Sequence, residues 1–117
     1  MQKGQINMNI NIKATNTTLT PAIRSNIENK LEVLSKFLKP EDVIHVELAE
    51  DTHHNSGQFF RVDIQISPRG SYAEARANDF YEGMDLVIPK ITQQLRKEKE
   101  KGISLRRRLG NLFKRGE

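Results

Sequence analysis

Residues 6–13 read Ile-Asn-Met-Asn-Ile-Asn-Ile-Lys, so apolar and polar side chains alternate one by one. A period of two puts the apolar side chains on one face of an extended chain, which predicts a half-buried β-strand. Soon afterwards the apolar residues adopt helical spacing, at Ile23, Ile27, Leu31, Leu34 and Leu38. This change of period predicts that the fold begins with a strand followed by a helix.

The expected bounds of this first helix come from its flanking residues. Thr20 is a suitable N-cap, and Pro21 suits the first helical position, where its missing N–H is not needed. The helix should run from Pro21 to about Leu38, because Lys39-Pro40 stops it.

Three more strands are predicted between this helix and the next. Their inward-facing residues are Ile44, Val46 and Leu48, then Phe60, Val62, Ile64 and Ile66, then Ala73, Ala75 and Ala77. A polar segment ending at Gly57 separates the first two of these strands, and a turn at residues 67–71 separates the last two.

A second helix closes the pattern. Asn78 or Asp79 should cap it, and Pro89 should kink it. The helix should continue to about Lys101 and stop at Gly102. Its apolar stripe consists of Phe80, Met84, Val87, Ile88, Ile91 and Leu95.

The order β-α-β-β-β-α predicts an α+β fold with a four-stranded mixed sheet. A right-handed crossover makes the first strand pair parallel, and short turns make the later pairs antiparallel. Both helices should pack on one face of the sheet and leave the other face exposed to solvent. We expect one domain over residues 1–102 and a basic tail over residues 103–117.

The composition narrows the function classes. The chain has 117 residues, 36% hydrophobic and 29% charged, with no cysteine. No run approaches a membrane span and no apolar signal segment opens the sequence, which favours a cytoplasmic protein. The absence of cysteine removes disulfides, thiolate catalysis and cysteine zinc sites.

Charge is distributed unevenly along the chain. Residues 1–88 hold 9 Lys/Arg and 12 Asp/Glu, a net −3, whereas residues 89–117 hold 10 Lys/Arg and 3 Asp/Glu, a net +7. Such asymmetry points to a polyanionic partner, either nucleic acid or an anionic membrane. A solvated basic tail with no partner is the plain alternative.

The tail itself combines charge with apolar residues. Leu105, Leu109, Leu112 and Phe113 have helical spacing, and five Lys/Arg are interleaved with them. Such a segment can fold on RNA or lie on a membrane surface. Because the segment is short and contains Gly110, we expect it to be disordered in isolation.

Enzymatic and metal-binding interpretations find little support in the sequence. The three histidines are His45, His53 and His54, and the last two are adjacent in a loop, where they cannot easily share one metal ion. There is no glycine-rich phosphate loop and no nucleophile turn. We therefore expect no catalytic residue, no metal, no cofactor and no small-molecule substrate.

The basic side of the second helix is the stronger signal. At about 100° per residue, Lys97 and Lys101 lie within about 20° of Lys90, so the three lysines form a line beside the apolar stripe. Arg96 points elsewhere. On the first helix, Arg24 and Lys30 flank the apolar stripe on opposite sides, and either could join the Lys90 line if the helices pack side by side. Such a strip suits phosphates rather than base edges, although ordinary solvated helix charge would give the same pattern.

Two stretches of the sequence resemble the ribosome hibernation-promoting factor family, also called ribosome-associated inhibitor or protein Y. The first is Leu19-Thr20-Pro21-Ala22-Ile23-Arg24 with Lys30-Leu31. The second is Asp79-Phe80-Tyr81-Glu82-Gly83-Met84-Asp85, followed by Lys90 and Gln94-Leu95-Arg96-Lys97. The resemblance covers about residues 6–101, and β-α-β-β-β-α is the family's fold.

The resemblance implies binding to the small ribosomal subunit, in the channel between head and body that messenger and transfer RNA use. It implies that the protein silences the 70S ribosome in stationary phase or stress, and that it is a monomer when free. The rRNA contacts carried over by position are Arg24, Lys30, Lys90, Lys97 and Lys101. Gln93 replaces an arginine of the family, and Arg96 is a candidate to compensate for it.

Other departures from the family pattern are Gly83 and Met84, where the family has Ala and Ile, and the unusual Pro89. Long members add a C-terminal dimerisation domain, which these 117 residues do not contain. Two other functions fit the same pattern: a general double-stranded RNA-binding module, and a regulatory domain that binds another protein through its strand edges or its tail.

Overall fold

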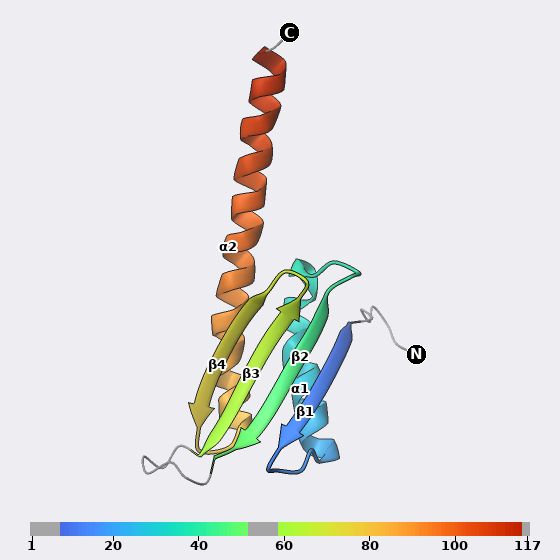
Figure 1. Ribbon diagram of the computed structural model, residues 1–117, viewed down its shortest axis with the longest axis vertical. Helices are drawn as coiled ribbons and strands as arrows, with labels where there is room; N and C mark the ends of the chain where they lie inside the picture. Colours follow the sequence, from blue (N-terminus) through green and yellow to red (C-terminus); the bar gives the residue numbers. More distant parts are fainter. Residues whose placement is uncertain (1–7, 52–58, 116–117) are drawn as a thin grey trace.

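The computed structural model describes residues 8–51 and 59–115, with side chains described as far as Lys101. The four strands form one sheet in the order β1-β2-β3-β4. The pair β1–β2 is parallel, and the other two pairs are antiparallel. Both helices cover the same face, α1 behind β1 and β2 and α2 behind β3 and β4 (Figure 1). The predicted fold class is confirmed.

The strands follow the period-two pattern closely. They are β1 (Asn9–Thr15), β2 (Val43–Glu50), β3 (Phe60–Ser67) and β4 (Ser71–Ala77). The predicted inward residues of β2 and β4 are buried, as are those of β3 apart from the partly buried Phe60. Ile6 and Gly57 lie outside the described residues.

The first helix begins where the sequence predicted and ends earlier. The Ile23 N–H donates to Thr20 Oγ1 at 3.1 Å, and α1 (Pro21–Leu31) starts at the proline. The chain then continues as a 3₁₀ helix, η1 (Glu32–Phe37), so the prediction of one α-helix to Leu38 is wrong. Three residues per turn keep Leu31, Leu34 and Phe37 on one side, facing the core.

The start of α2 (Phe80–Arg115) is fixed by a cap and by close packing. Asp79 Oδ1 accepts from the Glu82 N–H at 2.8 Å, which confirms Asp79 as the N-cap. Gly83 then lies so close to the sheet that a Cβ atom there would be 2.6 Å from Val62 Cγ2. The glycine therefore sets how near the helix packs to β3.

The far end of α2 differs from the prediction. The helix passes through Pro89 and Gly102 and ends at Arg115, so the predicted stop at Gly102 is wrong. A glycine inside a helix costs only about 1 kcal/mol relative to alanine, which its helix-forming neighbours can offset. In Figure 1 the helix extends well beyond the sheet.

An ionic cluster centred on Arg69, in the turn between β3 and β4, joins the middle of α2 to the residues that precede β2. Arg69 donates to Asp42 Oδ2 at 2.7 Å, to the Phe37 carbonyl at 3.1 Å and to Glu98 Oε1 at 3.4 Å. The Ser71 hydroxyl donates to Glu98 Oε2 at 2.9 Å. Asp42 is buried, so Arg69 provides the charge that compensates it.

We expect Gly83→Ala to lower the free energy of unfolding by about 1–2 kcal/mol. Overpacking against the stiff, buried Val62 outweighs the better helix propensity of alanine. Urea unfolding of Gly83→Ala, Val62→Ala and the double variant measures this. The double variant should lose less than the sum of the single losses, because the new methyl group fills the space vacated by the valine. A more stable Gly83→Ala chain would contradict the close packing.

Arg69→Ala should destabilise the fold by about 3 kcal/mol, because it leaves the buried Asp42 carboxylate without its cation. The matched control is Arg24→Ala, which removes an arginine from an exposed pair with Glu28 at 3.7 Å and should change stability by less than about 0.5 kcal/mol. Equal effects of the two substitutions in denaturant unfolding would show that the cluster contributes nothing.

Candidate nucleic-acid interface

One side of α2 lies along β4, which is an edge strand, and two of its polar side chains bind the strand's backbone. Lys90 Nζ donates to the Glu74 carbonyl at 2.9 Å. The Gln94 side chain accepts from the Tyr72 N–H at 3.1 Å and donates to the Tyr72 carbonyl. These side chains occupy backbone groups that an added strand would otherwise use.

The same side of α2 contains a hollow of about 300 Å³. It is lined by Ala73, Lys90, Gln93, Gln94 and Lys97. Lys90 and Lys97 are both exposed, so the hollow presents two ammonium groups and side-chain amides to solvent. Such an arrangement can hold an anionic group such as a phosphate. The predicted alignment of these two lysines is therefore confirmed.

The remaining predicted residues of α2 lie further along the helix. Lys101 is exposed about one turn beyond Lys97, and it is the last residue whose side chain is described. Arg96 is also exposed, about 100° around the helix from Lys97. Among residues 8–51 and 59–101, neither Lys97 nor Lys101 makes an ion pair, so both ammonium groups are available to a ligand.

The two predicted residues of α1 do not join this line. Lys30 Nζ contacts Asp85 Oδ1 of α2 at 2.7 Å, and Arg24 pairs with Glu28. Asp85 and Lys90 are about 140° apart around α2, so α1 and β4 lie on opposite sides of that helix. The expectation of a continuous strip from Lys90 to Arg24 or Lys30 is therefore wrong.

Three residues that support this surface were missed by the sequence analysis. Gln94 positions the helix on the edge of β4, and Arg69 with Glu98 fixes the turn of helix that carries Lys97. The sequence placed Arg69 only in a turn, and that turn is present, with Gly70 at a φ of 81°. Since its partners come from distant segments, no local pattern signalled its role.

Neither a metal-binding cluster nor a membrane-spanning helix is found among the described residues. No group of three or more His, Asp or Glu side chains there is arranged to hold a metal ion. His45 contacts Ser67 Oγ at 3.0 Å, and His53 and His54 lie outside the described residues. No helix in the described part is both long and apolar enough to cross a membrane.

Solved structures of related proteins share this fold. The N-terminal domain of Thermus thermophilus protein Y is 28% identical, with a TM-score of 0.63 over 77% of this chain and 98% of that one. A ribosomal subunit interface protein from Coxiella burnetii is also 28% identical, with a TM-score of 0.62 over 80% of this chain and 99% of that one.

Sequence comparison points to the same group of proteins. A ribosome hibernation promotion factor of Staphylococcus aureus (strain COL) is 37% identical over 90 residues, which cover 75% of this chain. The match covers 46% of that protein, so the chain spans about half the length of this curated relative. Residues 10–102 match the model of one family, and the chain therefore belongs to the Sigma 54 modulation protein / S30EA ribosomal protein family.

Proposed function

We propose that the chain is a ribosome hibernation factor of the cytoplasm, which binds the small ribosomal subunit in the decoding channel. Bound there, it blocks messenger and transfer RNA and inhibits translation during stress or stationary phase. The observation that carries this proposal is family membership over residues 10–102. The relatives named as a hibernation promotion factor and as a subunit interface protein support it.

The basic side of α2 supplies a physical basis for binding rRNA. Lys97 and Lys101 offer ammonium groups with no carboxylate partner among the described residues, and Lys90 offers donors beyond the one it gives to Glu74. Contacts with phosphates release counterions, which favours binding at low salt. We rank Lys97 and Lys101 first among the proposed contacts, followed by Lys90 and Arg96.

Arg24 and Lys30 remain proposed contacts of second rank. Both are in exposed ion pairs, which contribute at most about 1 kcal/mol and can exchange partners when a phosphate approaches. In this mechanism the protein acts by filling space, and no step requires a catalytic residue or a cofactor.

We expect Lys97→Ala to weaken binding to the small subunit and to lower the slope of log affinity against log salt by about 0.7–0.9. Lys97 makes no ion pair among the described residues, so the folded state should keep its melting temperature. The matched control is Lys39→Ala, an exposed lysine of the same charge next to Pro40. Filter binding from 50 to 300 mM salt tests both variants. If the two variants have the same slope, Lys97 makes no phosphate contact.

If the protein inhibits translation by filling the decoding channel, full inhibition should need about one protein per ribosome, because each molecule blocks only the channel that it fills. Titration into a cell-free translation assay measures the ratio, and a high-salt wash should restore activity. Bound transfer RNA should compete with the protein, whereas duplex RNA should not. Complete inhibition far below one equivalent that survives the wash would indicate an enzyme and refute the proposal.

A further inference from the structure

A line of basic residues continues from the core to the far end of α2. Because α2 is one continuous helix, each residue is placed around its axis at about 100° from the one before. Four further basic residues fall within about 20° of Lys90 on this scale: Lys97, Lys101, Arg108 and Arg115. At 1.5 Å per residue, the line from Lys90 to Arg115 is about 37 Å long.

The far part of this helix has a strong positive charge. Residues 102–115 contain five Lys/Arg and no Asp/Glu. This part extends beyond the sheet, and in Figure 1 no other described helix or strand lies beside it. Since the segment contains no carboxylate of its own, its charge is available to an anionic partner.

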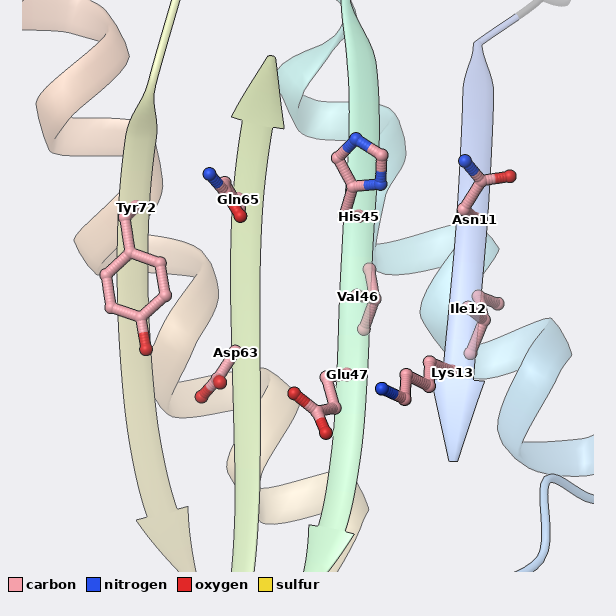
Figure 2. Close-up of a pocket in the computed structure, with 9 residues that line it drawn as sticks. All are labelled: Asn11, Ile12, Lys13, His45, Val46, Glu47, Asp63, Gln65 and Tyr72. Carbon is pink, nitrogen blue, oxygen red and sulfur yellow. The ribbon is translucent and has the colours of Figure 1, made fainter. Parts of the chain in front are cut away.

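The open face of the sheet is less suited to such a partner. In Figure 2 the carboxylates of Glu47 and Asp63 lie near the middle of that face, and Lys13 lies beside Glu47. Arg61 contacts both carboxylates, so its positive charge already has partners. A phosphate backbone on this face would meet carboxylates as well as cations, whereas along α2 it would follow cations only on the line.

An apolar stripe beside the line makes an anionic membrane the main alternative partner. Leu105, Leu109 and Leu112 fall about 40–100° from the line, on the side of α2 where Val87 and Ile91 pack into the core. The sheet lies on that same side of the helix (Figure 1), so a flat bilayer placed along the stripe would run into the sheet. The line itself begins on an exposed side of α2, so an extended polyanion can follow it.

We propose that the part of α2 beyond Lys101 is a second RNA-binding element, in which Arg108 and Arg115 extend the lysine line along the same phosphate backbone. Arginine suits this role because its guanidinium can donate two parallel N–H bonds to one phosphate. A continuous helix also holds the cations in a fixed order, which lowers the entropy cost of binding. The inference rests on the proposed function, since it requires that Lys90 and Lys97 meet rRNA.

Two pairs of substitutions remove equal charge from the same segment. Arg108→Ala with Arg115→Ala takes two cations from the line. The control, Arg106→Ala with Lys114→Ala, takes two cations that lie at least about 120° away from it. Alanine favours helix, so circular dichroism should show unchanged helix content in both variants. Filter binding of each full-length variant to small ribosomal subunits is measured over a series of salt concentrations.

The pair on the line should lower the slope of log affinity against log salt by about 1.4–1.8, twice the value for one phosphate contact. Its affinity at about 100 mM salt should fall at least about tenfold. The control pair should change the slope by less than about half as much, because its cations lie away from the backbone that the line follows.

Insertions of alanine after Gly102 test the angle while every charge is kept. Two alanines rotate Arg108 and Arg115 by about 200°, away from the line, and should weaken binding about as much as the substitutions on the line. Four alanines rotate them by about 40° and should retain most of the affinity.

Equal slopes for the two substitution pairs, or equal affinities for the two insertions, would overturn the inference, because the segment would then attract RNA only as diffuse charge. The membrane alternative is tested with vesicles of phosphatidylglycerol and phosphatidylcholine at about 150 mM salt. Vesicle binding that Leu105→Ser with Leu109→Ser abolishes, together with equal slopes on the subunit, would assign the segment to a membrane surface instead.

The same assay separates this inference from the function on which it rests. An original chain that binds no small subunit would refute both. If the original chain binds and Lys97→Ala weakens it, equal behaviour of the two substitution pairs would refute the inference alone.

Discussion

The close contact between Gly83 and Val62 is the constraint on which the position of α2 depends. With no side chain at Gly83, the start of the helix can lie directly against β3. At that distance Gln94 and Lys90 reach the backbone of the edge strand β4. The basic side of α2 is thus placed by packing at one end of the helix and by hydrogen bonds in its middle.

Those hydrogen bonds also affect how Lys90 can bind a ligand. Lys90 donates to the backbone of β4 and also lines the hollow beside α2, so its ammonium group is held in place before any ligand binds. A side chain ordered in advance loses less conformational entropy when it binds. Lys97, by comparison, has no partner of opposite charge among the described residues.

Much of the fold could be predicted because its signals are local. Alternation in β2 and β3 and the Thr20 cap depend on neighbours in the chain, and all three are confirmed. The angular spacing of residues around a helix also predicted correctly that Lys90 and Lys97 lie on one side of α2. They could not tell which side of α2 faces α1, because an angle within one helix contains no information about its neighbours. The Lys30–Asp85 pair and the Arg69 cluster join distant segments, so only the tertiary structure reveals them.

Because α2 continues without a break from the core to Arg115, a small change in its direction at Glu98 becomes a larger displacement at its far end. The seventeen residues beyond Glu98 span about 25 Å at 1.5 Å per residue. A tilt of about 10° at the Arg69–Glu98 contact would therefore carry the helix end sideways by about 4 Å, roughly the spacing between neighbouring strands. The direction in which the arginine-rich end of the chain points therefore depends on the turn between β3 and β4 as well as on the packing at Gly83.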